Sequence, residues 1–199
     1  MVYHWYIAVL IVSYLLGSLS FGTVISRANG VNIFDGGSGS SGATNVQRMV
    51  GKRAGRTVFI LDFLKGFAPT LLLLKFYPMG NIPSERLAMT CLLGILVGHS
   101  LSIFHHFRGG KGIASMMGGL LSIMPSSFAI GILVWLVIFH ATRIVSVASL
   151  CFSTSVMLTA YLFYAPEYII FALLLNLIVF WRHRENIARL INGTEHRFM

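Results

Sequence analysis

The sequence contains few charged residues. Only 11% of its 199 residues are Asp, Glu, Lys or Arg, whereas 56% are hydrophobic and the mean hydropathy is +0.78. An ordinary soluble domain carries about 25% charged residues, so this chain has too little polar side chain to cover a soluble globule. The composition excludes a water-soluble enzyme and a disordered chain, and it indicates an integral membrane protein.

Acidic residues and cysteines are also scarce. The chain has six Asp and Glu residues, and its two cysteines, Cys91 and Cys151, lie inside apolar stretches. This placement excludes a disulfide framework and a thiolate metal site. The net charge of +9 would suit nucleic-acid binding. In a membrane protein, however, basic residues hold cytoplasmic loops against anionic lipid headgroups, so we expect a lipid bilayer and no nucleic acid as partner.

Apolar stretches long enough for membrane spans recur along the chain, since a span needs about 20 apolar residues. They cover residues 5–25, 57–77, 87–104, 113–141, 144–164 and 167–181. The fourth is too long for one span, and Pro125 interrupts it. Proline removes a helical hydrogen bond and clashes with the preceding turn, so we expect a break there.

The basic residues decide the number of spans. A break at Pro125 gives seven transmembrane helices, with the N-terminus outside, the C-terminus in the cytoplasm and residues 1–199 in a single all-α membrane domain. The cytoplasmic loops then contain Arg27, Arg48, Lys52, Arg53, Arg56, Arg108, Lys111, Arg143, Arg182, Arg184, Arg189 and Arg197. A single helix over 113–141 would place the C-terminal arginines opposite the basic 27–56 loop, against the positive-inside rule.

The first cytoplasmic loop is rich in small polar residues from Asp35 to Arg48. Glycines let backbone amides turn toward an oxyanion, and the hydroxyls of Ser38 and Thr44 and the amide of Asn45 add further polar groups. If 44–50 is helical, its N-terminus also favours an anion. A flexible Gly/Ser linker is the alternative interpretation.

The second loop, 105–112, reads His-His-Phe-Arg-Gly-Gly-Lys-Gly. Glycines around Lys111 suit a phosphate, but the spacing of a nucleotide-binding P-loop is absent. A basic loop anchored at lipid headgroups is the alternative interpretation.

The third loop, 182–195, is basic, and on a helix His183 and Asn186 share one face, as do Glu185 and Arg189. A lipid anchor is its alternative interpretation.

Several polar residues fall inside the spans. Asp62 and Lys65 are three residues apart and can pair on one helix face, while His99 can be a satisfied polar residue at an interface. Ser146 and Ser149 lie near the cytoplasmic end of a span, where serines often bond to the backbone. Together, the polar and cationic residues of the cytoplasmic face predict a site for one or two phosphates.

Four segments resemble the bacterial PlsY-type glycerol-3-phosphate acyltransferases. They are Gly37-Ser-Gly-Ser-Ser-Gly-Ala-Thr-Asn-Val-Gln-Arg48, Asp62-Phe-Leu-Lys-Gly66, Gly98-His99 with Phe107-Arg-Gly-Gly-Lys-Gly112, and Arg182-His-Arg-Glu-Asn-Ile187 with Gly193-Thr-Glu195. The resemblance implies a seven-helix enzyme of the bacterial inner membrane. Such enzymes transfer an acyl group from acyl phosphate to the 1-hydroxyl of glycerol 3-phosphate, giving lysophosphatidic acid and phosphate, without a cofactor or metal. It also implies a functional link to an enzyme that makes acyl phosphate.

The resemblance also implies roles for individual residues. Those implied to bind phosphate or substrate are Ser38, Thr44, Asn45, Arg48, Lys111, Ser149 and His183, and those implied to be catalytic are Ser38, Lys111, His183 and Asn186. A substrate phosphate would take the proton of the attacking hydroxyl, although His183 remains open as a general base. Ser40-Ser41 departs from the Asn-Pro usual in the family, which removes the φ restriction of proline.

Three other functions fit the sequence less well. A transporter of organic phosphates would use the same cations, but these cluster at one face and no inverted repeat is evident. A CDP-alcohol phosphotransferase needs several aspartates on metal ions, and this chain has only Asp35 and Asp62. A purely structural membrane subunit leaves the polar loops unexplained.

Overall fold

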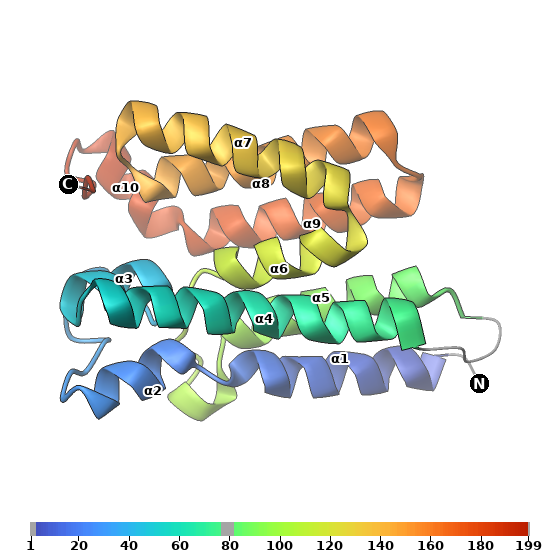
Figure 1. Cartoon of the computed structure of the whole chain (residues 1–199), viewed down its shortest axis with the longest axis horizontal. Helices are drawn as coiled ribbons and strands as arrows, with labels where there is room; N and C mark the ends of the chain where they lie inside the picture. The colour runs from blue at the N-terminus through green and yellow to red at the C-terminus, as the bar shows by residue number, and fades with distance from the viewer. Residues whose placement is uncertain (1–2, 77–81, 199) are drawn as a thin grey trace. The chain divides into compact units, whose positions relative to one another are not determined.

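The computed structural model describes residues 3–76 and 82–198, which form helices and no β-strand (Figure 1). In chain order the helices are α1 (Tyr3–Ser18), α2 (Phe21–Ala28), α3 (Ala43–Met49), α4 (Lys52–Phe76), α5 (Ser84–Ser100), the 3₁₀ helix η1 (Ile103–His105), α6 (Ile113–Ile123), α7 (Pro125–Thr142), α8 (Val145–Phe163), α9 (Pro166–Arg182) and α10 (Arg184–Ile191). The chain divides into two compact units, unit 1 (Met1–Ile123) and unit 2 (Met124–Met199). A single domain over 1–199 stays a prediction.

Most of the expected spans are present. Among the described residues, five segments are long and apolar enough to cross a bilayer: Tyr3–Ala28, Lys52–Phe76, Ser84–His105, Pro125–Thr142 and Val145–Phe163. The pair α9 and α10, bent by 58°, is a sixth if it counts as one span. Helix α6 has 11 residues, about 16 Å at 1.5 Å per residue, whereas the hydrocarbon core is about 30 Å thick. The all-α membrane class is therefore confirmed, and the seventh crossing stays a prediction.

The expected break at Pro125 is confirmed. Helix α6 ends at Ile123, and α7 begins at Pro125, the first residue of the new helix. The missing N–H of proline costs nothing at that position, because the first N–H groups of a helix have no partner inside the helix.

A second break was not expected. The apolar stretch 5–25 divides into α1 and α2, and the Ser20 hydroxyl accepts a hydrogen bond from the Thr23 amide at 3.3 Å. Neither proline nor a run of polar residues marks this point in the sequence. A serine cap explains how α2 begins, and contacts from other helices explain how α1 ends.

Unit 1 is built around α5, which packs against α1, α4 and α6. Glycines bring the backbones together, because a Cβ atom on Gly17 would collide with the Ile95 carbonyl and one on Gly98 with the Tyr14 carbonyl. At the contact of α4 with α6, a Cβ atom on Gly118 would collide with the Phe63 carbonyl. Close approach at small residues is the usual packing mode of membrane helices, where burial of apolar surface adds little.

Unit 2 consists of α7 to α10, in which α8 packs against both α7 and α9. Buried hydrogen bonds join these helices: Thr159 donates to the Ser127 hydroxyl at 2.8 Å, and Ser153 donates to the Asn176 side chain at 2.8 Å. The C-terminal tail folds back onto this unit, where the Phe198 amide donates to the Arg143 carbonyl at 2.7 Å.

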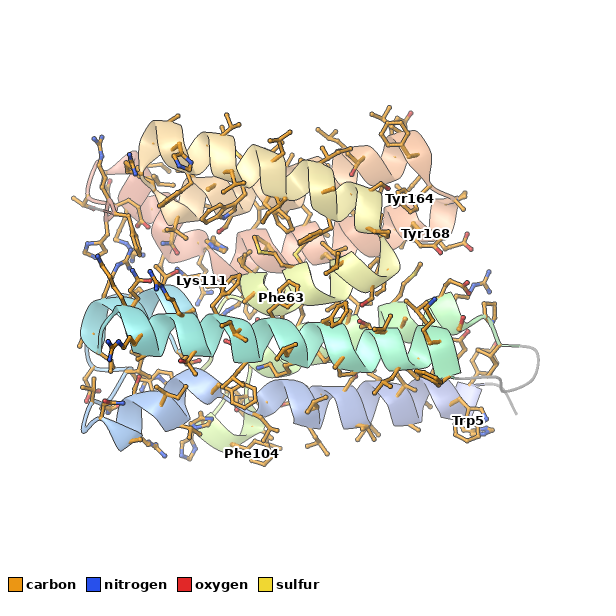
Figure 2. All side chains as sticks on the ribbon, viewed as in Figure 1. Trp5, Phe63, Phe104, Lys111, Tyr164 and Tyr168 are labelled. Carbon is orange, nitrogen blue, oxygen red and sulfur yellow. The ribbon has the colours of Figure 1, made fainter. Side chains whose placement is uncertain are left out.

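Aromatic residues lie at helix ends (Figure 2). Trp5 is in the first turn of α1, and the rings of Tyr164 and Tyr168 lie 5.2 Å apart at the connection from α8 to α9. Such positions suit the membrane interface, where amphipathic rings gather at headgroup level.

Candidate functional site

The glycine- and serine-rich loop of unit 1 is organised by Asn45, which is 1% exposed. Its side-chain nitrogen donates to the carbonyls of Ile33, Gly36 and Ser40 at 3.0–3.2 Å, and its oxygen accepts from the Ser38 amide at 2.9 Å. These bonds fold residues 33–40 around one side chain. Asn45 therefore shapes the loop, and its direct contact with a phosphate stays a prediction.

Ser38 lies at the turn of this loop. It stands between Gly37 and Gly39, whose φ angles of +61° and +59° belong to the left-handed region that glycine adopts without strain. Its hydroxyl is 3.3 Å from that of Ser40, and its side chain is half-buried. The loop is thus a defined structure, which argues against a flexible linker.

Helix α3 follows directly, so the segment 44–50, whose helical state the sequence left open, is helical to within one residue. Thr44 and Arg48 are four residues apart and share one face of it. Thr44 is half-buried and Arg48 is exposed in the last turn. The helix thus adds a hydroxyl and a guanidinium to the polar loop that precedes it.

The two polar loops of unit 1 meet at Phe34. The Arg108 guanidinium lies 4.6 Å from the centre of the Phe34 ring and donates to the Phe34 carbonyl at 3.3 Å. The rings of Phe34 and His105 are 6.2 Å apart. A cation on an aromatic face with an added hydrogen bond thus ties the 101–112 segment to the loop that contains Ser38.

Lys111 precedes α6 in that second segment (Figure 2). The Gly110 amide donates to the His99 carbonyl at 3.0 Å, which fixes the chain just before Lys111. Gly112 follows with a φ angle of +80°. Unit 1 therefore contains five of the expected site residues, on two loops that touch each other and on helix α3: Ser38, Thr44, Asn45, Arg48 and Lys111.

In unit 2, His183 lies at the bend between α9 and α10 and is 2% exposed. Its Nδ1 is 2.8 Å from the Val179 carbonyl. Because a carbonyl only accepts, Nδ1 carries a hydrogen and donates it to Val179. Asn186, 3% exposed, lies three residues later in α10, and a helix face shared with His183 stays a prediction.

Glu195 in the C-terminal tail connects Asn186 and Arg189 of α10 to α8. Its carboxylate accepts from Asn186 at 2.6 Å, from Arg189 at 2.7 Å and from Ser146 at 2.9 Å. Burial alone would raise the pKa of this carboxyl, but the bonds from Asn186, Arg189 and Ser146 outweigh it and lower the pKa. Glu195 is thus a structural anion that orients Asn186.

Two side chains in this region have partners other than those that the sequence suggested. Arg189 and Glu185 share a face by spacing, but Arg189 pairs with Glu195, and Glu185 lies beside Arg184 at 3.8 Å. Ser146 was expected to bond to the backbone and instead bonds to Glu195. Ser149, one turn further along α8, is buried and accepts from the Trp135 indole at 3.5 Å.

Comparison with known proteins identifies the family. The family model described as glycerol-3-phosphate acyltransferase matches residues 7–193, which cover nearly all of both units. The chain belongs to the glycerol-3-phosphate acyltransferase family. The resemblance drawn from the four motif segments is confirmed.

Curated relatives support this assignment. The chain is 44% identical over 189 residues to a glycerol-3-phosphate acyltransferase of Aquifex aeolicus, with 94% of this chain and 96% of the relative covered. It is 37% identical over 193 residues to the enzyme of Myxococcus xanthus, with 96% and 98% covered.

Solved structures agree. The chain resembles the crystal structure of PlsY (YgiH), an integral membrane glycerol 3-phosphate acyltransferase, in its glycerol 3-phosphate form, with a TM-score of 0.89 and 40% identity over 98% of this chain and 96% of that one. The lysphosphatidic acid form of the same protein gives a TM-score of 0.85, with 98% and 95% covered.

Ser40 and Ser41, where the chain departs from the family, are held by contacts with Asn45 and with α2. The Ser40 carbonyl accepts from Asn45, and a Cβ atom on Gly22 of α2 would collide with the Ser41 carbonyl. Both serines are buried. The turn is therefore fixed by Asn45 and by close contact with α2, so this member of the family holds it without proline.

Proposed function

We propose that this protein transfers a fatty acyl group from acyl phosphate to the 1-hydroxyl of glycerol 3-phosphate, giving lysophosphatidic acid and phosphate. The observation that carries the proposal is the pair of polar loops in unit 1, joined at Phe34 and Arg108, which contain Ser38 and Lys111 and are followed by Arg48 on α3. Family membership supports the acceptor, because the relatives are glycerol-3-phosphate acyltransferases and PlsY was solved in forms named after acceptor and product.

In this proposal, the glycerol hydroxyl oxygen attacks the acyl carbonyl carbon, and the bond from that carbon to the phosphate oxygen breaks. The proton of the hydroxyl passes to the departing phosphate, so no protein base is required. Lys111 and Arg48 stabilise the phosphate charge. The Ser38 hydroxyl and the His183 ring donate hydrogen bonds to phosphate oxygens, and Asn186 orients the glycerol.

The acyl donor gives the first test. The loop that contains Ser38 is composed mostly of small residues, and glycines flank Lys111 in the other loop, so we expect them to fit a phosphate rather than a nucleotide. Purified protein in detergent should form lysophosphatidic acid from acyl phosphate and glycerol 3-phosphate, with no product above background from acyl-CoA or acyl carrier protein. Robust turnover with acyl-CoA in the absence of acyl phosphate would contradict this proposal, and counterflow of labelled glycerol 3-phosphate without product would favour a transporter.

We also propose seven crossings of the bacterial inner membrane, with the N-terminus outside and the active site on the cytoplasmic side. The support is the distribution of basic residues, since cytoplasmic loops carry an excess of Lys and Arg. The protein would then meet acyl phosphate at the inner surface, close to the enzyme that makes it.

Cysteine labelling tests this topology. In a variant without Cys91 and Cys151, single cysteines at the exposed positions Asn32 and Asn192 should react with an impermeant maleimide only after the cells are opened. A cysteine at Asn81, which lies outside the described residues, or at the exposed Glu85, should react in intact cells. The reverse pattern would invert the topology.

A further inference from the structure

Three ionisable side chains are buried together where α4 meets α5. The Lys65 ammonium lies 3.0 Å from the Asp62 carboxylate and 3.1 Å from Nδ1 of His99, and that nitrogen lies 3.6 Å from Asp62. Their exposed fractions are 2% for Asp62, 5% for Lys65 and 7% for His99. Ionisable groups inside a membrane span are costly and usually functional. The proposed chemistry uses none of these three.

Lys65 also binds the end of α1. Its ammonium donates to the Gly17 carbonyl at 3.2 Å and to the Leu19 carbonyl at 2.9 Å. The last carbonyls of a helix have no partner within the helix, and a membrane interior offers them no water. Lys65 therefore supplies the hydrogen bonds and the positive charge that this helix end requires.

The segment that contains Lys111 contacts the same end of α1 and the same buried cluster. The Ser102 hydroxyl donates to the Ser18 carbonyl at 2.7 Å. A Cβ atom on Gly109 would collide with the His99 carbonyl, and one on Gly110 would collide with Nε2 of the His99 ring. Gly109 and Gly110, directly before Lys111, thus pack closely against His99, which in turn contacts Lys65 and Asp62.

The loop that contains Ser38 is connected to the same end of α1 through α2. Helix α2 starts two residues after Leu19, and its Gly22 packs against the Ser41 carbonyl. A fixed Leu19 carbonyl therefore fixes the start of α2, and α2 supports the turn that follows Ser38. The buried cluster therefore contacts the residues that support both polar loops of unit 1.

We propose that Asp62, Lys65 and His99 are positioning residues that set the geometry of the Lys111 and Ser38 loops for phosphate binding. If Asp62 and Lys65 served only as an ion pair within α4, they would need neither His99 nor the contact of Lys65 with α1. Well-packed apolar residues often stabilise a core as much as a buried ion pair does, so the directed bonds of the cluster point to control of loop geometry. The inference rests on the proposed function, because it assigns these residues to the glycerol 3-phosphate site.

A double-variant cycle tests the proposal. We expect His99→Ala to raise the KM for glycerol 3-phosphate at least tenfold, because a shift of about 1 Å in a binding group can cost roughly 100-fold in rate. If His99 acts through Lys111, adding His99→Ala to Lys111→Ala should lower kcat/KM by less than about twofold further. Losses that multiply in the double variant, or an unchanged KM in His99→Ala, would overturn the positioning role.

Two further variants separate positioning from folding. His99→Asn keeps a polar atom near the position of Nδ1, so it should remain within about fivefold of the unchanged protein; a KM as high as that of His99→Ala would count against the proposal. Cys91→Ala, a buried change in the same helix, should leave the KM unchanged even if it lowers thermal stability. A raised KM in Cys91→Ala would show that any core defect disturbs the loop, and the specific role of His99 would be wrong.

Amide hydrogen exchange distinguishes this proposal from the proposed reaction. Exchange over 105–112 should be at least tenfold faster in His99→Ala and unchanged in Cys91→Ala, whatever the acyl donor. If the unchanged protein forms no lysophosphatidic acid but the loop still loosens, the reaction is wrong and the structural coupling stands. If product forms and neither the KM nor the exchange responds to His99→Ala, the positioning role is wrong.

Discussion

Replacement of Lys111 by alanine is expected to lower kcat/KM for acyl transfer by about 10- to 200-fold, because a charge-assisted hydrogen bond contributes roughly 1.5–3 kcal/mol. The two glycines before Lys111 and the one after it let the backbone come close to an anion, while the ammonium supplies a compact charge. Arg48→Ala and Ser38→Ala should cause losses in the same range. The measurement is the initial rate of lysophosphatidic acid formation at varied glycerol 3-phosphate.

Arg56 provides a matched control for the loss of one positive charge. Arg56 is an exposed cation in the first turns of α4, and Arg56→Ala removes one positive charge without touching either polar loop's hydrogen bonds. We expect its kcat/KM to stay within about threefold of the unchanged protein, since salt largely screens an exposed charge that makes no direct contact with a substrate. An equal loss in Arg56→Ala and Lys111→Ala would mean that net charge, rather than a specific contact, attracts the substrates.

Replacement of Glu195 by alanine is expected to abolish most activity and to lower thermal stability. Three donors, on Ser146, Asn186 and Arg189, would lose their shared acceptor. Leaving buried donors unsatisfied costs about 1–3 kcal/mol, which for a chain of this size corresponds to a Tm lower by roughly 2–12 °C. Activity should fall because the Asn186 side chain loses its fixed orientation. The removed carboxylate would act through Asn186, not as a proton acceptor.

The control for Glu195 is Glu185, a carboxylate on the neighbouring helix whose side chain is 65% exposed. Glu185→Ala removes the same charge and should leave activity and Tm nearly unchanged. Equal effects of the two substitutions would show that the region responds only to its net charge.

The pH dependence follows from the lowered pKa of Glu195. A carboxyl whose pKa is lower in the folded state stabilises the protein fully above the pKa of the unfolded chain, about 4.3, and loses that contribution as the pH falls through the folded value. The difference in Tm between the unchanged protein and Glu195→Gln should therefore be constant from pH 5 to 8 and shrink below about pH 4. A difference that grew as the pH fell would contradict the charged, hydrogen-bonded state of Glu195.

Much of the fold could be predicted, because hydrocarbon imposes simple rules. Long apolar stretches predicted the spans, and the chemistry of proline predicted the break before α7. Spacing along a helix predicted the pair of Asp62 with Lys65. Each of these features depends on residues close together in the sequence.

The features that could not be predicted depend on residues far apart. The end of α1 is set by Lys65, 46 residues beyond Leu19. Glu195 bonds to Ser146 across 49 residues, and no local pattern assigns that carboxylate to α8 rather than to a nearby arginine. Asn45 was expected beside phosphate because of its amide, but only the folded loop reveals that carbonyls from Ile33 to Ser40 already use its hydrogens.

The contact of Lys65 with α1 has a consequence for biosynthesis. Inserting a lone Lys or Asp at the centre of a helix costs about 2.5–3.5 kcal/mol at the translocon. Asp62 and Lys65 neutralise each other within α4, so the segment enters the bilayer without net charge at that depth. The carbonyls of Gly17 and Leu19, which accept hydrogen bonds from Lys65, lie at the C-terminal end of α1 and just after it, in a segment that leaves the ribosome earlier. The acceptor carbonyls are therefore synthesised before the Lys65 ammonium that donates to them.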